Sequence, residues 1–170
     1  MIGIKKATEV ANSTLEAHYK SNSNISSSNN PKKLLSELDI AYKLKKYPSV
    51  SQKYIASHHY TDKTANGLTK MILDYIKFSG GFAERINSFG IYDVKLGRFR
   101  PSGSRKGTAD ISATFKGKSL KIEVKVNGDR MSDAQRRYAD EVTAAGAAYF
   151  VATDFNSFYS WFENLKICRP

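Results

Sequence analysis

Two neighbouring stretches of the chain alternate between apolar and polar residues. The apolar positions are Ala109, Ile111, Ala113 and Phe115 in the first stretch, and Leu120, Ile122, Val124 and Val126 in the second. A period of two residues is the pattern of a strand with one buried face. The residues between the stretches, Lys116-Gly117-Lys118, suit a turn. The pattern therefore predicts a β-hairpin over about residues 108–126.

The polar face of this hairpin carries Asp110, Glu123 and Lys125. Cross-strand partners point to the same side of a sheet, so the loop must contain an even number of residues. A two-residue turn at Gly117-Lys118 pairs Asp110 with Lys125, and one at Lys116-Gly117 pairs Asp110 with Glu123. Either register clusters all three side chains. Two adjacent carboxylates repel, and a bound hard cation or an uptake of protons relieves the repulsion.

Helical spacing of apolar residues predicts two helices before the hairpin. The first runs from Pro31 to Lys46 behind an Asn30 N-cap, and the second runs from about Asp62 or Lys63 to Phe78, where Gly80-Gly81 ends it. The segment Phe82–Asn87 then predicts a strand without a clean apolar face.

After the hairpin, the pattern predicts a helix, a strand and a last helix. Ser132 to Gln135 has the form of a capping box that starts the helix closed by Gly146. Ala147–Ala152 is an apolar segment, and a strand–helix–strand unit of this length predicts parallel pairing with the second hairpin strand. The aromatic residues of the last helix, about Asp154 to Leu165, recur at helical spacing and are expected to pack on the sheet.

These elements predict an α/β fold with a central mixed β-sheet of about four strands flanked by helices. Met1–His18 is expected to form a short helix, and Ser13–Asn30 is rich in Ser and Asn, as in a flexible linker. We therefore expect residues 1–60 to be a basic, partly flexible N-terminal extension and residues 61–170 to be the core domain.

The net charge of the chain bears on which partners it binds. The 170 residues carry a formal net charge of +11 and a pI near 9.7, which favours a polyanionic partner such as DNA, with an anionic membrane surface as the alternative. No run of about 18 apolar residues and no signal-peptide core is present, so we expect a soluble, cytoplasmic protein. The single cysteine, Cys168, excludes an internal disulfide and a Cys/His zinc site.

Asp110 followed by Glu123-Val124-Lys125 resembles the site motif of the PD-(D/E)XK nuclease superfamily. Gly107 ahead of Asp110, the hairpin, the capped helix and the following strand resemble the order in its VRR-NUC and Holliday-junction-resolvase branches. The segment that contains Gly81, Phe82, Arg85, Ser88 and Gly90 is also similar to resolvase-like members, and it extends the resemblance from Asp62 to the C-terminus.

The resemblance implies a restriction-endonuclease-like fold and metal-dependent hydrolysis of DNA. Asp110, Glu123 and the backbone carbonyl of Val124 would hold Mg²⁺, with Mn²⁺ as a substitute. Lys125 would position or deprotonate a water, or stabilise charge on the phosphate. Gln135 would lie near this site, although its reciprocal cap with Ser132 explains it equally well. The resemblance to resolvases further implies branched DNA as a substrate and a homodimer. Recombination, restriction and phage or mobile-element DNA processing all fit such an enzyme.

Several cations are expected to contact DNA phosphates. A glycine-containing loop from Tyr92 to Arg105 is expected to carry three of them, and the alternative is that its cations only solubilise a mobile loop. The predicted contacts are Arg85, Arg98, Arg100, Arg105, Lys106, Arg130 and Arg136.

The chain departs from the family at the first helix of the core. Many members place a glutamate there, whereas Asp62–Phe78 contains none, and Asn66, Asp74 and Glu84 are the candidate substitutes. The Val-Arg-Arg tripeptide is also absent. A catalytically inactive nucleic-acid-binding protein on the same fold is therefore the main alternative to the nuclease. A structural or assembly protein that uses its charge on nucleic acid is the third hypothesis.

Overall fold

The computed structural model describes residues 30–87, 91–100 and 103–167. The helix predicted for Met1–His18, almost all of the predicted linker, Ser88, Gly90 and Cys168 lie outside these ranges.

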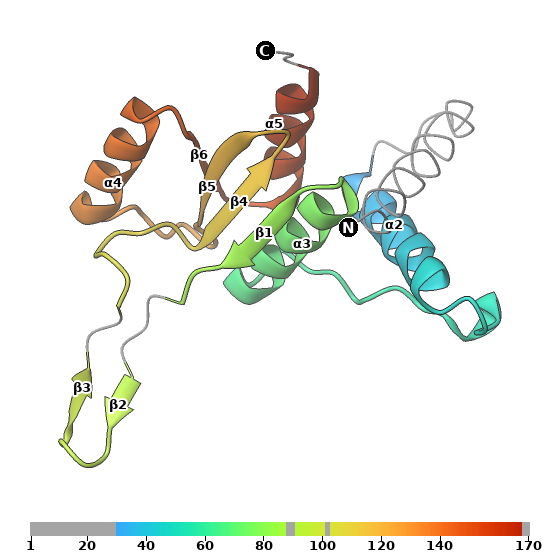
Figure 1. The fold of residues 1–170 in the computed structure, drawn as a ribbon, viewed down its shortest axis with the longest axis horizontal. Helices are drawn as coiled ribbons and strands as arrows, with labels where there is room; N and C mark the ends of the chain where they lie inside the picture. The colour runs from blue at the N-terminus through green and yellow to red at the C-terminus, as the bar shows by residue number, and fades with distance from the viewer. Residues whose placement is uncertain (1–29, 88–90, 101–102, 168–170) are drawn as a thin grey trace, which may run out of the picture.

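A four-stranded mixed sheet forms the centre of the molecule (Figure 1). Its strands are β1 (Phe82–Arg85), β4 (Ile111–Phe115), β5 (Lys118–Val124) and β6 (Ala148–Ala152), in that spatial order. Strand β4 is antiparallel to both β1 and β5, and β6 is parallel to β5. The predicted α/β class, mixed sheet and parallel pairing are confirmed.

Helices cover this sheet, and their bounds are close to those expected. They are α2 (Pro31–Lys46), α3 (Ala65–Phe78), α4 (Asp133–Ala144) and α5 (Phe155–Ile167), with a short 3₁₀ helix η2 (Gln52–Tyr54) after α2. Helix α3 begins at Ala65 because the Thr64 side chain accepts a hydrogen bond from the Gly67 amide at 3.1 Å, which satisfies an amide of the first turn.

The hydrophobic core lies between one face of the sheet and helices α3 and α5. The apolar stripe of α3 is buried against Ile111, Ile122 and their neighbours, and Phe155, Phe158 and Phe162 of α5 are fully buried in the same cluster. The aromatic residues of the last helix are therefore core residues, as predicted. Polar residues of β4 and β5 lie on the other face, next to α4.

Helix α2 shares this core. Leu35 is fully buried in the core cluster. Asp62 fastens α2 to α5, because its carboxylate accepts from Lys32 Nζ at 2.7 Å and from the Phe155 amide at 3.2 Å. Buried Asp39 accepts from the His58 amide at 2.6 Å and so ties down the segment after α2. The domain boundary at residue 60 stays a prediction, but helix α2 of the expected extension packs into the same core as the rest of the fold.

The basic loop expected from Tyr92 to Arg105 is wrong in part. Residues Ile91–Asp93 (β2) and Arg98–Arg100 (β3) pair in antiparallel register as a separate two-stranded sheet, which projects from the rest of the molecule (Figure 1). Gly97 at the turn has φ +59°, a conformation that glycine adopts without strain. The cations and glycines of this segment concealed a short hairpin, because each strand is only three residues long.

Candidate active site

The turn between β4 and β5 decides the register that the sequence left open. Phe115 pairs with Lys118 and Ile111 with Ile122, so the turn residues are Lys116 and Gly117. Both have positive φ, +47° and +79°, as a type I′ hairpin turn requires. Continued by one residue, this register sets Asp110 opposite Glu123. The alternative, with Asp110 opposite Lys125, is wrong.

Asp110 is anchored to the neighbouring strand. Its Oδ2 accepts a hydrogen bond from the Val124 amide at 2.9 Å. On the other side, its backbone carbonyl accepts from the Ile86 amide at 2.7 Å, which continues the pairing of β1 with β4. The carboxylate is therefore held beside the backbone of the residue after Glu123.

Glu123 is the buried centre of the cluster, with 1% of its surface exposed. Its Oε1 accepts from Gln135 Nε2 and lies 3.3 Å from Lys125 Nζ. Its Oε2 is buried without a hydrogen-bond partner in the described structure. Burial, followed by repulsion from Asp110, raises the pKa of Glu123 to about 7 despite the opposing charge of Lys125. The site therefore holds one buried oxygen that protein groups leave unsatisfied.

Lys125 lies between two carboxylates. Its Nζ is 3.3 Å from Glu123 Oε1 and 3.1 Å from Asp129 Oδ2, and only 10% of the side chain is exposed. Burial alone lowers the pKa of Lys125, but the hydrogen bond to Asp129 and the charge of Glu123 outweigh burial, so the pKa is raised. The Lys125 side chain is therefore protonated and positively charged at neutral pH.

Gln135 makes both of the contacts that the sequence offered as alternatives. Its Oε1 accepts from the Ser132 amide at 2.9 Å, which completes the capping box of α4, and its Nε2 donates to Glu123. One side chain thus caps the helix and orients the buried carboxylate.

Gly107 explains how α4 approaches the hairpin so closely. Its φ is +87°, and a Cβ at this position would lie 2.3 Å from the Ala134 carbonyl oxygen. Only glycine lets the segment before Asp110 touch the first turn of α4, which carries Gln135.

Tyr149 belongs to this face of the sheet and was missed in the sequence. It lies beside Lys121 in the parallel register, and its hydroxyl is buried with no partner in the described structure. Burial, with smaller contributions from Glu123 and Asp110, raises its pKa. The segment Ala147–Ala152 was interpreted only as an apolar strand, although its single polar-tipped residue shares the parity of the polar face.

The predicted DNA contacts do not form one cluster but are spread over several elements. Arg105 and Arg136 pair with Glu141 and Asp133 of α4, at 2.6 and 3.4 Å. Arg85 of β1 donates to Asn66 Oδ1 of α3 at 2.9 Å. Arg98 and Arg100 lie on β3, apart from the main sheet, while Lys106 and Arg130 lie exposed on connecting segments.

The three candidate substitutes for the family's helix glutamate lie in different surroundings. Asn66 binds Arg85, and Asp74 accepts from Tyr60 and Lys70 at 2.9 and 3.1 Å. Exposed Glu84 pairs with Ser112, on the sheet face that carries Asp110 and Glu123. Among residues 30–87, 91–100 and 103–167, no group of three or more His, Cys, Asp and Glu side chains is arranged to hold a metal ion.

The cluster nevertheless fits a hard cation through oxygen atoms. Mg²⁺ is commonly held by one or two carboxylates and otherwise keeps its waters. Asp110 and Glu123 supply two, and the orphaned Oε2 of Glu123 is an acceptor that lacks a donor in the part of the chain that the structure describes.

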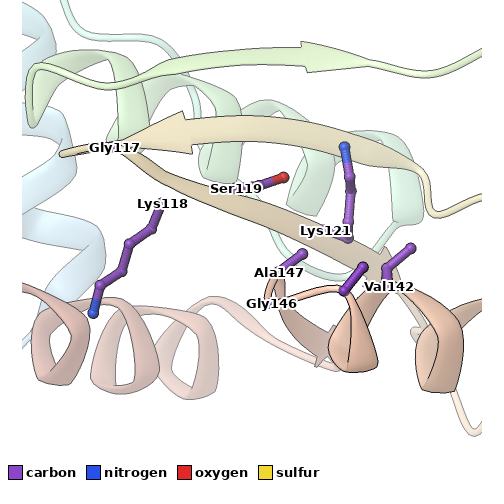
Figure 2. A pocket seen from close by; sticks show the side chains of 8 residues that line it. Gly117, Lys118, Ser119, Lys121, Val142, Gly146 and Ala147 are labelled. Atoms are coloured by element: carbon purple, nitrogen blue, oxygen red, sulfur yellow. The ribbon is translucent and has the colours of Figure 1, made fainter.

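A second feature of this face lies at the opposite end of α4. An open hollow of about 460 Å³ is lined by residues that include Lys118, Ser119, Lys121 and Val142 (Figure 2). Lys121 Nζ donates to Ser112 Oγ at 2.6 Å. None of Asp110, Glu123, Lys125 and Gln135 lines this hollow, so it is distinct from the carboxylate pair.

Two comparisons with known proteins bear on this geometry, and neither found a match. No protein-family model matches the chain, and no curated protein matches it. Within the described residues, no helix has the length and apolarity needed to cross a membrane. The fold is α/β with a four-stranded mixed sheet, and membership in a nuclease superfamily stays a prediction.

Proposed function

We propose that the protein is a metal-dependent DNA endonuclease of the PD-(D/E)XK type, similar to the VRR-NUC and Holliday-junction-resolvase branches. One observation carries the proposal: Glu123 is a fully buried carboxylate with an unsatisfied oxygen, next to Asp110 and Lys125. Burying such a group is unfavourable for folding, so its presence favours a functional role.

Asp110, Glu123 and the Val124 carbonyl would hold Mg²⁺ or Mn²⁺, which would activate water and neutralise charge on the phosphate. Gln135 and Lys125 both engage Oε1 of Glu123, so Oε2 is the oxygen left for the ion. Asp110 uses only Oδ2 to accept from Val124. Lys125 is a cation with a raised pKa, so it suits charge stabilisation on phosphate better than removal of a proton from water.

The direct test is plasmid nicking with Mg²⁺ or Mn²⁺ by three variants, Asp110→Asn, Glu123→Gln and Lys125→Met. Each is expected to lose at least about a hundredfold in rate, because each removes a group from the reacting centre. DNA binding without metal should persist. Asp140→Asn on the exposed side of α4 and Glu37→Gln on α2 are matched controls and should cleave like the wild type. Undiminished cleavage by all three site variants would refute the proposal.

The absence of a glutamate on α3 favours a second candidate, a nucleic-acid-binding protein that does not cleave. The nuclease and the non-cleaving binding protein predict different results in a cleavage panel of plasmid, linear and branched DNA with each metal. Salt-sensitive binding without metal-dependent nicking would support the second candidate. Metal binding is measured separately by thermal unfolding. Mn²⁺ should raise the melting temperature of the wild type but not that of Asp110→Asn. The resolvase-like proposal also includes branched DNA as the substrate and a homodimer. The same DNA panel tests the preference for branched DNA.

A further inference from the structure

The hairpin formed by residues 91–100, here called the arm, stands apart from the four-stranded sheet (Figure 1). Its strands pair Ile91 with Arg100 and Asp93 with Arg98, and they form a sheet of their own. In Figure 1 the arm extends away from the four-stranded sheet and its helices. An isolated two-stranded hairpin is marginally stable in water, so such an arm gains from a binding partner.

The arm combines exposed apolar side chains at its tip with cations beside them. Val94 is 85% exposed and Leu96 is 56% exposed, so two apolar side chains at the turn are largely accessible. Exposed Lys95 and Arg98 lie in the same hairpin. The ten residues contain three basic residues, Lys95, Arg98 and Arg100, against one acid, Asp93. The arm therefore offers apolar contact together with positive charge.

Charge favours DNA over a second copy of the chain as the partner. The arm has more basic than acidic residues in a chain of net charge +11, so contact between the arms of two copies is opposed by charge while a polyanion is attracted. Shape favours a duplex. The major groove of B-DNA is about 12 Å wide and about 8.5 Å deep, and it admits a two-stranded β-ribbon. At about 3.4 Å per residue, strands of three residues and their turn reach roughly 10–15 Å, enough to fill that depth.

We propose that the arm enters the major groove of double-stranded DNA and thereby selects duplex over single-stranded substrate. Val94 and Leu96 contact base edges, where thymine methyl groups offer an apolar surface, and Lys95 and Arg98 bind phosphates or guanine edges. This inference rests on DNA as the partner, which is part of the proposed function, but it does not depend on cleavage.

The test measures binding of the full chain by fluorescence anisotropy in EDTA, so that no metal-dependent cleavage intervenes. The probes are a fluorescein-labelled duplex two helical turns long and one of its strands alone. The arm-charge variant is Lys95→Ala/Arg98→Ala, and the arm-tip variant is Val94→Ser/Leu96→Ser. The matched control, Lys53→Ala/Lys70→Ala, removes the same charge from η2 and α3, where both lysines are exposed.

The arm-charge variant should bind the duplex about tenfold more weakly and should lower the slope of log affinity against log salt by about 1–2. The arm-tip variant should lose several-fold in duplex affinity at an unchanged slope, because it removes no charge. Single-strand affinity should change no more than in the control. Thermal unfolding should match the wild type for both arm variants, since the arm lies outside the core.

Three results would overturn the inference. They are a loss by the arm-charge variant no larger than that of the control, an equal loss on both probes, and a change of molar mass in light scattering by the arm-tip variant. The last result would mean that a second copy covers the tip. Metal-dependent nicking by the wild type is measured separately. Nicking without a duplex preference from the arm refutes only this inference, and an arm effect without nicking refutes only the nuclease.

Discussion

Glu123 shows how one residue can oppose folding and serve a site. Its carboxylate is shielded from water, faces Asp110, and has one oxygen that no protein donor satisfies in the described structure. The raised pKa, about 7, means that the folded chain binds a proton more tightly than the unfolded chain does. The charged form therefore lowers the free energy of unfolding. A bound cation, which favours the charged form, would remove that cost.

Replacing Glu123 with Gln should therefore stabilise the metal-free protein at alkaline pH. The carboxylate's cost is absent below its ordinary value of 4.5, grows between 4.5 and about 7, and is complete above about 7. In urea unfolding at about pH 8, Glu123→Gln should exceed the wild type by up to about 3 kcal/mol, and the gain should vanish near pH 4.5. Gln keeps an acceptor for Gln135. Glu37→Gln, half exposed on α2, should show no such dependence. A gain that is constant with pH would contradict the titration of Glu123.

At the scale of elements, alternation along the chain predicted which residues of the hairpin share a face, but it left the register open. Which residues share a face follows from the alternation within each strand. The register instead depends on Lys116 adopting φ +47°, a backbone conformation that is unfavourable for residues other than glycine. The capping box could be predicted because Ser132 and Gln135 are close in sequence. The bond from the Val124 amide to Asp110 could not, because it joins backbone and side chain across two strands. Strand pairing and local caps could therefore be predicted here, whereas the register and the individual side-chain bonds between strands could not.

Helix α4 should lose its place over the site when Gly107 is replaced. Gly107→Ala introduces a Cβ within 2.3 Å of the Ala134 carbonyl oxygen, at φ +87°. Gly117→Ala is the matched control, since its φ is +79° but no atom lies within 4 Å of the added Cβ. Both variants lose about 1 kcal/mol to the left-handed backbone, and only Gly107→Ala must also shift α4.

Thermal unfolding should therefore place Gly107→Ala well below Gly117→Ala, and metal-dependent nicking should fall in the former alone, because Gln135 moves with α4. Equal melting temperatures for the two variants would mean that the contact with Ala134 does not restrain the helix.

For the molecule as a whole, composition indicated a polyanionic partner and the helical pattern indicated α2, but neither showed how α2 is attached. The attachment depends on single residues. Leu35 enters the core between elements far along the chain, and Asp62 binds Lys32 and the Phe155 amide together. Contacts of such long sequence separation have no local signature, which is why residues 1–60 were interpreted as an extension.

The attachment of α2 makes a prediction about the smallest folded unit. Leu35 is fully buried, so Leu35→Ala should lower the free energy of unfolding by about 2–5 kcal/mol through lost burial and the cavity left behind. Lys33→Ala on the exposed side of the same helix should change it by less than about 0.5 kcal/mol. A chain that begins at residue 61 loses Leu35 and the Lys32 partner of Asp62 together, and it uncovers apolar surface on α3 and α5. It should therefore melt well below the full chain or fail to fold, as measured by circular dichroism. A truncated chain with the melting temperature of the full protein would instead establish residue 60 as a true domain boundary.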